Sequence, residues 1–221
     1  MRAVIFDMDG VLFDTERLCL LAWRAVAQAN GLAGVEEVFP KCVGLSETDC
    51  RQVVTEELGE DFDYPRFSRQ ASAWMRAYID KNGLPVMEGA EHLLGWLEAQ
   101  GCKVGLASST VYDSVVRHLE RSGLRRYFSQ LTTGDMVEHS KPQPDIYLLA
   151  CSRMGVEPGD TYAIEDSPNG IRAAHGAGMI PLMVPNMIAP DEEMQRLSRE
   201  IFGSLEEVLA YFRKEGNGWH T

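Results

Sequence analysis

The sequence predicts an α/β protein with a doubly wound parallel sheet, interrupted near the N-terminus by a helical insertion. Three observations lead to this fold class. Short continuous apolar runs recur along the chain, segments with a helical repeat of apolar residues separate them, and one long early stretch contains helical repeats only. Strands that alternate with helices are typical of a Rossmann-like sheet of parallel strands.

Four apolar runs have the character of strands that are buried on both faces. The first, Ala3–Phe6, does not alternate with polar residues and ends just before two aspartates. Unalternating runs with β-branched residues are typical of the inner strands of parallel sheets. Similar runs occupy residues 103–107, 162–164 and 180–184. We therefore assign these four runs to the sheet.

The segments between these runs repeat their apolar residues with helical spacing. Ala90 is followed by leucines three, four and seven residues later, which places one apolar stripe along a helix. A second repeat follows Pro144, a residue type favoured in a first helical turn, and a third follows Ser204, a good N-cap. We expect these helices to cover the faces of the sheet.

Residues 15–85 interrupt this alternation, because they contain no convincing strand. Helical patterns fill the stretch instead, over residues 18–29, 46–58 and 65–81. The stretch is too long for a single crossover connection. We therefore predict an α/β core of residues 1–14 and 86–221 that carries an inserted all-helical cap domain of residues 15–85.

The composition and charge of the chain exclude several classes of function. The chain has 221 residues, of which 45% are hydrophobic and 24% charged, and its formal net charge is −12. So acidic a chain is poorly suited to bind nucleic acid or an anionic membrane, since both require cations against phosphate. Its apolar runs are shorter than the ~18 residues of a membrane span, and Met1 begins no signal-peptide pattern. We expect a monomeric, cytoplasmic protein without nucleic-acid or membrane partners.

The cysteines agree with a reducing compartment. There are five of them, an odd number, and no two form a C-x-x-C pair. Because zinc sites draw their thiolates from such close pairs, a zinc site is disfavoured and free thiols are expected.

Polar side chains gather after the predicted strands, at the edge where open α/β sheets bind ligands. Asp7 and Asp9 follow the first strand and are expected to project into one space, because residues two apart on an extended chain point the same way. The other polar residues near this edge are Ser108, Ser109, Thr110, Lys141, Glu165 and Asp166. The carboxylates of Asp7, Asp9 and Asp166 would repel one another, so we predict a Mg²⁺ ion among them. A hydroxyl and a lysine that face this ion would suit the oxygens of a phosphoryl group.

These residues resemble the motifs of the haloacid dehalogenase-like hydrolase superfamily. Residues 7–16 resemble its opening motif, Ser108 and Lys141 match its second and third motifs, and residues 165–170 match its fourth. The helical insertion lies where that family carries a four-helix cap. A lone D-x-D is weak evidence, whereas four motifs in order at strand ends are specific and span nearly the whole chain. The resemblance is to the branch of capped phosphatases and β-phosphoglucomutases.

The resemblance implies a covalent reaction in two steps. Asp7 would attack phosphorus and form an aspartyl-phosphate. Asp9 would protonate the departing oxygen and then deprotonate the water that cleaves the intermediate. The Asp7 carboxylate, the Asp9 backbone carbonyl and Asp166 would hold Mg²⁺.

The same resemblance assigns the residues around the phosphoryl group. Ser108 and Lys141 would hold its non-bridging oxygens, helped by backbone N–H groups that include that of Ser109. Glu165 would not contact the phosphoryl group directly but would act on the residues that do, or through a water molecule. The core would supply only general phosphoryl chemistry, and the cap would provide selectivity. The acidic surface and the small cap suggest a small soluble phosphorylated metabolite, such as a sugar phosphate, as the substrate.

Other functions fit the sequence less well. A dehalogenase needs neither a metal nor a second acid, so Asp9, Glu165 and Asp166 argue against it. A binding module without catalysis would not need the complete set of motif residues. No cap lysine stands at the motif position expected for phosphonate cleavage.

A phosphomutase is the closest alternative. In the β-phosphoglucomutases, a histidine on the first cap helix and an arginine in the cap loop help to protect the phosphoenzyme from water. Alignment of the motifs puts Cys19 and Glu47 at these two positions, so a thiol replaces a base and a negative charge replaces a positive one. Residues 44–46 resemble the substrate-facing cap loop of the family. We therefore expect net hydrolysis of a small phosphate monoester.

Overall fold

The computed structural model describes residues 3–43 and 47–214 of the chain. The chain divides into two compact units. One is formed by the segments up to Phe13 and from Pro85 onward, and the other is Asp14–Leu84.

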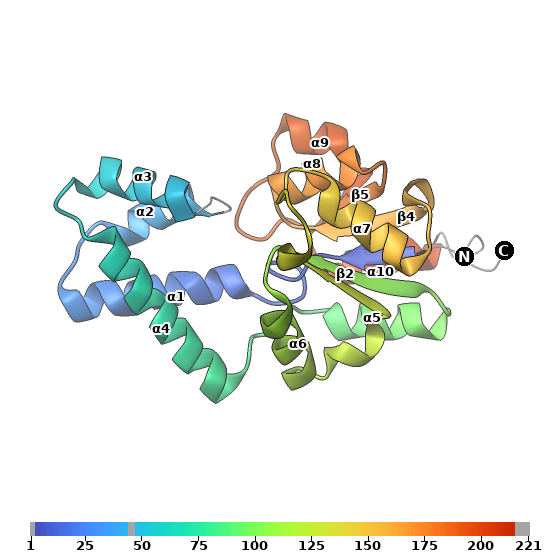
Figure 1. Ribbon diagram of the computed structural model, residues 1–221, viewed down its shortest axis with the longest axis horizontal. Helices are drawn as coiled ribbons and strands as arrows, with labels where there is room; N and C mark the ends of the chain where they lie inside the picture. Colours follow the sequence, from blue (N-terminus) through green and yellow to red (C-terminus); the bar gives the residue numbers. More distant parts are fainter. Residues whose placement is uncertain (1–2, 44–46, 215–221) are drawn as a thin grey trace. The chain divides into compact units, whose positions relative to one another are not determined.

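The larger unit is built on a single parallel sheet (Figure 1). Its strands lie in the order β3-β2-β1-β4-β5-β6. Their bounds are β1 Ala3–Phe6, β2 Lys103–Ser108, β3 Gln130–Thr133, β4 Thr161–Glu165, β5 Ile180–Met183 and β6 Glu200–Ile201. β1 pairs with β2 on one side and with β4 on the other, so the strand order reverses at β1. The predicted doubly wound α/β class is therefore confirmed.

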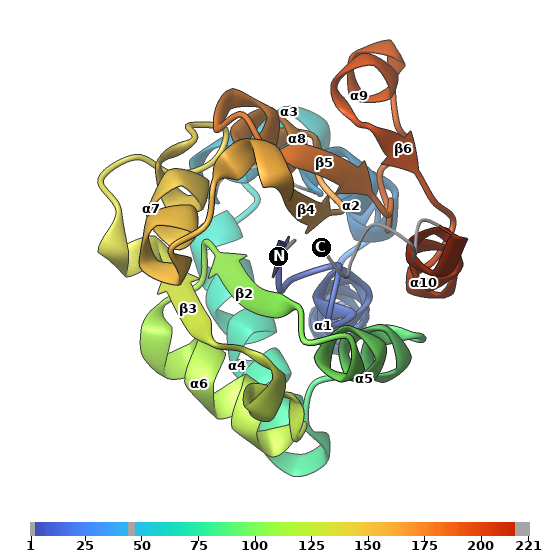
Figure 2. The ribbon, with the colours of Figure 1, turned by 90° about the vertical axis from the view of Figure 1, so that its right-hand side faces the viewer.

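Helices flank this sheet on both sides (Figure 2). The α-helices are α5 Ala90–Ala99, α6 Tyr112–Arg121, α7 Asp145–Met154, α8 Pro168–Gly176, α9 Glu192–Leu197 and α10 Leu205–Lys214. Short 3₁₀ turns occupy Leu124–Tyr127, Gly134–Met136 and Pro158–Asp160. α7 and α8 lie on one side of the sheet, and α5 and α10 pack together on the other. Pro144 and Ser204 stand directly before α7 and α10, as the sequence predicts for helix starts.

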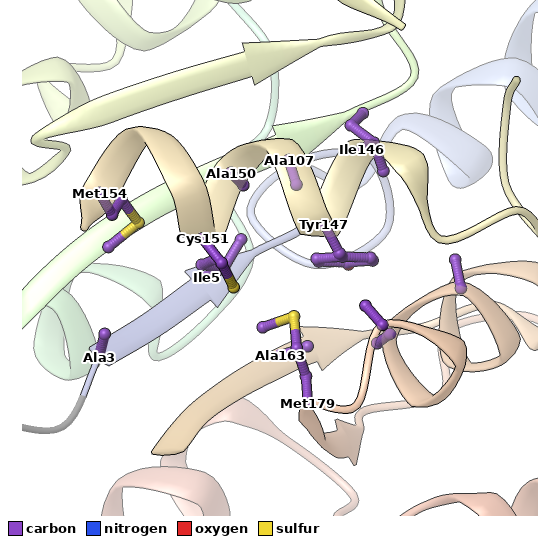
Figure 3. Close-up of a cluster of buried hydrophobic side chains, with 13 residues drawn as sticks. Ala3, Ile5, Ala107, Ile146, Tyr147, Ala150, Cys151, Met154, Ala163 and Met179 are labelled. Atoms are coloured by element: carbon purple, nitrogen blue, oxygen red, sulfur yellow. The ribbon is translucent and has the colours of Figure 1, made fainter. Parts of the chain in front are cut away.

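The alternation of side chains along β1 divides the core between the two faces. Ile5 points toward α7 and packs with Tyr147 and Met154, as Figure 3 shows. Phe6 points to the other face and meets the ring of Phe128 edge-on, with the ring centroids 6.3 Å apart. All four residues of β1 are buried, as expected for the central strand of a parallel sheet.

Two strands of the sheet, β3 and β6, were not predicted from the sequence. β3 has the sequence Gln130-Leu131-Thr132-Thr133. Because three of its four residues are polar, it does not stand out as an apolar run, although both threonines are fully buried. β6 is only two residues long and occupies the edge of the sheet. Tertiary pairing with longer neighbours creates both strands.

The smaller unit is helical in its described residues. Its helices are α1 Thr15–Asn30, α2 Val35–Cys42, α3 Glu47–Leu58 and α4 Tyr64–Asn82. Trp23 of α1 lies at its centre and meets the rings of Phe39 and Phe67 edge-on, each at a centroid distance of 5.1 Å. Helix α2 was not predicted from the sequence. Its buried residues Val35, Val38, Phe39 and Cys42 have helical spacing, but the helix contains Pro40, a residue type that is unfavourable inside a helix. The bounds of this unit differ by one residue at each end from the predicted cap, and residues 44–46 of the expected cap loop lie outside the described residues.

The structure also bears on two expectations from composition. All five cysteines are free thiols. Among the described residues, no helix is both long enough and apolar enough to cross a membrane.

Candidate active site

The candidate site lies where β1, β2 and β4 end side by side. Phe6 at the end of β1 is in register with Leu106 of β2 and Ile164 of β4. Asp7 continues this alignment, because its backbone N–H donates to the carbonyl of Ile164 at 3.0 Å. The carboxyl ends of the three strands therefore bring Asp7, Ser108 and Glu165 to one edge. This edge surrounds the point where strand order reverses, the usual ligand position in open α/β sheets.

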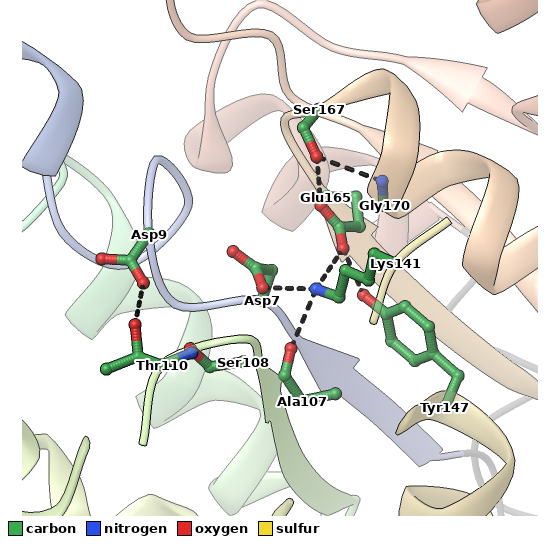
Figure 4. Close-up of polar contacts among 10 residues, drawn as sticks. All are labelled: Asp7, Asp9, Ala107, Ser108, Thr110, Lys141, Tyr147, Glu165, Ser167 and Gly170. Carbon is green, nitrogen blue, oxygen red and sulfur yellow. Dashed lines mark hydrogen bonds and ion pairs between the residues drawn. The ribbon is translucent and has the colours of Figure 1, made fainter. Parts of the chain in front are cut away.

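Lys141 connects the carboxylates of this edge (Figure 4). Its ammonium nitrogen lies 2.5 Å from Asp7 Oδ1 and 2.6 Å from Glu165 Oε1, and it donates to the carbonyl of Ala107 at 3.1 Å. Only 8% of the Lys141 side chain is exposed. Burial of an ammonium group with two carboxylates costs desolvation free energy. Such a cluster is therefore unusual unless the function of the protein requires the lysine at this position.

Glu165 is fixed from three directions. Besides Lys141, its Oε1 accepts a hydrogen bond of 2.6 Å from the hydroxyl of Tyr147, and its Oε2 accepts one of 3.4 Å from Ser167. Ser167 also caps α8, since its hydroxyl accepts from the backbone N–H of Gly170 at 3.1 Å. Gly170 has to be a glycine, because an added Cβ would lie 2.0 Å from the Glu165 carboxyl carbon.

Three buried carboxylates converge beside this lysine. Asp7, Glu165 and Asp166 each offer one oxygen, and these oxygens lie within 4.8 Å of one another. Gly10, at φ +80°, permits the close approach of its loop, since a Cβ there would lie 2.0 Å from Asp166 Oδ2. A donor set of carboxylate oxygens suits a hard cation such as Mg²⁺. The residues present therefore fit the predicted metal.

Asp9 turns toward a different partner. Its Oδ2 accepts a hydrogen bond of 2.9 Å from the hydroxyl of Thr110, while the backbone N–H of Thr110 donates to Ser108 Oγ at 3.1 Å. The side chains of Asp9 and Asp7 are thus held by separate groups, as Figure 4 shows. The converging carboxylates in the described part of the chain are those of Asp7, Glu165 and Asp166, not the set of Asp7, Asp9 and Asp166 that strand geometry suggested.

The electrostatics of the edge reflect a surplus of buried negative charge. Burial raises the pKa of Asp7 to about 8, an effect that Lys141 opposes and Glu165 reinforces. Burial would lower the pKa of Lys141, but the carboxylates of Asp7 and Glu165 outweigh it and hold this pKa above its usual range. Both shifts have the same origin, since one ammonium faces several desolvated carboxylates. A second positive charge at this edge would lower the pKa of Asp7.

The comparison with protein families agrees with this geometry. Residues 1–178 match the model of the haloacid dehalogenase-like hydrolases. The chain belongs to this family. As a haloacid dehalogenase-like hydrolase, it carries the family's motif residues at the ends of β1, β2 and β4, where the sequence analysis placed them.

Curated relatives with assigned activities are found among hydrolases and mutases. The chain is 34% identical to a phosphorylated carbohydrates phosphatase of Thermotoga maritima over 81% of this chain and 82% of the relative. It is 30% identical to the β-phosphoglucomutase of Bacillus subtilis over 83% of each chain. Among solved structures, a haloacid dehalogenase family hydrolase of Deinococcus radiodurans, crystallised with phosphate and sodium, has a TM-score of 0.82. That structure is 26% identical and covers 98% of this chain and 96% of its own.

Two groups of this hydrolase's site escaped the sequence analysis as individual residues. Tyr147 was hidden within the apolar stripe of α7, although a tyrosine that is fully buried needs a partner for its hydroxyl. Thr110 was grouped with its serine neighbours as a polar segment, and only the fold reveals its bond to Asp9. Ser109 is exposed, and its backbone carbonyl lies against Gly134, where a Cβ would lie 2.2 Å from it.

Proposed function

We propose that this protein hydrolyses a small phosphate monoester, a sugar phosphate or similar metabolite, through an aspartyl-phosphate on Asp7 with the help of Mg²⁺. The observation that carries the proposal is the position of Lys141, buried between Asp7 and Glu165 and beside Asp166. A lysine alone would bind phosphate, and carboxylates alone would repel it. Their combination at one strand edge suits a phosphoryl group held against a carboxylate nucleophile.

In the first step, an oxygen of the Asp7 carboxylate attacks phosphorus while the bond from phosphorus to the leaving oxygen breaks. Lys141 stays protonated beside Asp7 and offers its charge to the non-bridging oxygens. Ser108 at the end of β2 and the backbone of Ser109 add hydrogen-bond donors. Glu165 holds the Lys141 ammonium in position and does not touch the substrate.

Asp9 moves the protons of both steps. Its carboxyl group gives a proton to the departing oxygen, and the resulting carboxylate then takes a proton from water. That water oxygen attacks phosphorus and releases the Asp7 carboxylate together with inorganic phosphate. The Thr110 hydroxyl, which donates to Asp9 Oδ2, keeps the side chain in one orientation for both transfers.

The Asp7 carboxylate, the Asp9 backbone carbonyl and Asp166 would hold the Mg²⁺ ion. When bound, it supplies positive charge that offsets the repulsion between phosphate and carboxylates and lowers the pKa of the nucleophile. The raised pKa of Asp7 in the metal-free chain supports this role, since Asp7 attacks only as a carboxylate.

Residues 15–85 serve as a cap domain that selects the leaving group, and the chain acts as a monomer on a soluble metabolite. The relative that acts on phosphorylated carbohydrates favours a sugar phosphate. The net charge of −12 disfavours nucleic acid as a substrate.

A panel of metabolite phosphates, assayed for released phosphate with Mg²⁺ present, tests the proposal. We expect turnover of at least one sugar phosphate, none in a chelator, and none with the Asp7→Asn variant. Asp160→Asn, an identical change at an exposed position, serves as the control and should retain full activity. Release of phosphate by Asp7→Asn at more than a trace would disprove the covalent mechanism.

A phosphomutase remains the second candidate, because a β-phosphoglucomutase is among the relatives. Incubation with β-glucose 1-phosphate and a bisphosphate primer separates the two activities. Free phosphate formed faster than glucose 6-phosphate supports hydrolysis, and the reverse order assigns the chain as a mutase.

A further inference from the structure

A cavity of about 490 Å³ lies at the amino ends of β4, β5 and β6. Tyr162 near the start of β4 and Ile180 at the start of β5 are in register, and both form part of its wall. The rest of the wall comes from Met179, Pro181 and residues 196–199, which end α9 and lead into β6 (Figure 2). A space of this size is within the range of small-molecule sites.

This cavity is separate from the candidate active site. The strands of the parallel sheet begin at one edge and end at the other, and the candidate catalytic residues follow the strand ends. In β4, Tyr162 belongs to the cavity wall, whereas Glu165 belongs to the active site and lies roughly 10 Å farther along the strand. The described wall contains none of the candidate catalytic residues, although the cavity and the site belong to the same compact unit.

Two arginines give the cavity positive charge. Arg196 from the last turn of α9 and Arg199 before β6 both line it, and both residues are exposed. The backbone N–H of Arg199 donates to the carbonyl of Pro181 at 2.7 Å, which holds this residue against the start of β5. The described part of the wall contains no aspartate or glutamate, so the charge of the two guanidinium groups is not balanced within it.

The carboxylate of Glu193, which interacts with the charge of Arg196, is already bound by another arginine. Arg172 Nη2 lies 2.5 Å from Glu193 Oε2, and Arg172 Nε donates to both carboxylate oxygens at 3.2 Å. Within residues 3–43 and 47–214, neither Arg196 nor Arg199 forms an ion pair with a carboxylate. Both guanidinium groups are therefore available to a ligand.

The rest of the wall combines apolar surface with one hydroxyl group. Tyr162 and Met179 are buried, and Ile180 and Leu197 add further apolar surface. Ser198 stands between the two arginines in the sequence, and its buried Oγ has no hydrogen-bond partner among the residues that the structure describes. Because buried hydroxyls are normally hydrogen-bonded, an acceptor at the arginines would satisfy this group after rotation about its Cα–Cβ bond.

We propose that this cavity binds a small organic anion, with a phosphate or carboxylate group at Arg196 and Arg199 and its carbon skeleton on the apolar wall. Guanidinium groups present paired N–H donors that match two oxygens of either group. In a chain with a net charge of −12, two arginines without ion pairs at one cavity attract an anion locally. The cavity is a second ligand site, and the inference does not depend on the proposed hydrolysis.

Two aromatic anions and a neutral analogue serve as probes. Phenylphosphonate and benzoate carry a phosphonate and a carboxylate on the same ring, and benzamide carries no charge. Phenylphosphonate contains no phosphate ester, so a phosphatase does not consume it. The Kd of each probe is measured by isothermal titration calorimetry with the full chain in Mg²⁺-free buffer, at 50 and at 500 mM NaCl.

The variants are Arg196→Gln and Arg199→Gln, both at exposed positions. Arg213→Gln is the matched control, because Arg213 is an exposed arginine of the same unit that does not line the cavity. All three variants should release phosphate from substrate as fast as the unmodified protein, since none of these arginines belongs to the candidate active site.

We expect at least one anion to bind and benzamide to show no measurable binding. Arg196→Gln and Arg199→Gln should each weaken binding of this anion at least fivefold, and Arg213→Gln less than twofold. The higher salt concentration should also weaken binding, because it screens exposed charges. The anion with the lower Kd identifies the preferred group as phosphate or carboxylate.

Three results would overturn the inference. The first is the absence of measurable binding by both anions, and the second is binding of benzamide with the same Kd as the anions. The third is an unchanged Kd in both cavity variants, which would place the anion elsewhere, including the candidate active site. Loss of binding in these variants with undiminished phosphate release supports the second site, whatever the fate of the proposed hydrolysis.

Discussion

Replacement of Tyr147 by phenylalanine isolates one hydrogen bond at the centre of the site. The Tyr147 hydroxyl donates to Glu165 Oε1 at 2.6 Å, and both residues are fully buried. Burial and the nearby Glu165 carboxylate raise the pKa of Tyr147 well above its usual range, so the hydroxyl keeps its proton. The phenylalanine ring keeps the shape of the core and leaves a ring beneath Lys141, whose ammonium lies 5.0 Å from the Tyr147 ring centroid.

The expected loss follows from the partners that remain. A hydrogen bond to a charged group contributes roughly 1.5–3 kcal/mol. Glu165 Oε1 keeps its bond to Lys141, so the carboxylate is not left bare and the lower half of this range applies. We expect the free energy of unfolding to fall by about 1.5–2 kcal/mol, which for a chain of this size lowers Tm by roughly 3–8 °C. Because Lys141 keeps its three partners, kcat should fall less than tenfold.

The measurement is urea unfolding of the metal-free protein at pH 7, with Tm and phosphate release recorded on the same preparation. Tyr127→Phe removes a hydroxyl that accepts a hydrogen bond of 2.6 Å from the exposed Arg126, and it should leave the free energy of unfolding nearly unchanged. If Tyr147→Phe is as stable as Tyr127→Phe, the hydroxyl does not stabilise the Glu165 carboxylate and the argument from burial is wrong.

Three further predictions concern charge and metal. Folding raises the pKa of Asp7 from 3.8 to about 8, so the metal-free folded chain holds a proton there that the unfolded chain has lost, and its free energy of unfolding should fall as pH rises from 4 to 8. Asp7 contributes a slope of at most ~1.4 kcal/mol per pH unit, and this contribution should be missing in Asp7→Asn when the urea midpoints of the two proteins are compared across pH. Activity should vanish in a chelator, return with Mg²⁺ and be inhibited by Ca²⁺, which prefers more ligands at longer distances; full turnover in the chelator would contradict the site. Gly10→Ala places a Cβ 2.0 Å from Asp166 Oδ2 at φ +80°, so the Mg²⁺ concentration for half-maximal activity should rise at least tenfold. Gly59→Ala is the control, because its φ is also positive but its Cβ has open space, and it should leave this Mg²⁺ concentration unchanged.

The sequence predicts the sheet because its central strands carry their own signal. Ala3–Phe6 and the runs at residues 104–107 and 162–164 contain no charged residue, since both faces of a parallel sheet are covered. β3 has no such signal, because Thr132 and Thr133 are buried through their position in the sheet and not through their hydrophobicity.

In the candidate site too, some residues could be predicted from the local sequence, whereas others become visible only through tertiary contacts. Asp7, Lys141 and Asp166 follow from motifs whose spacing is visible in the chain. The partner of each carboxylate does not, because Thr110 and Tyr147 reach Asp9 and Glu165 from elements far away in sequence. The alternation rule concerns only the direction of Asp7 and Asp9, and it does not predict the partner of each, which is Lys141 for Asp7 and Thr110 for Asp9.

The ammonium group of Lys141 has three N–H bonds, and Asp7, Glu165 and the carbonyl of Ala107 accept from it. A phosphoryl oxygen that reaches this lysine therefore enters by exchange, and the contact it gains is offset by the one it displaces. When phosphate leaves, the Asp7 carboxylate can bind the Lys141 ammonium again, which compensates for the contact that is lost. Inorganic phosphate should accordingly be a weak competitive inhibitor, and release of product should not limit the rate of turnover.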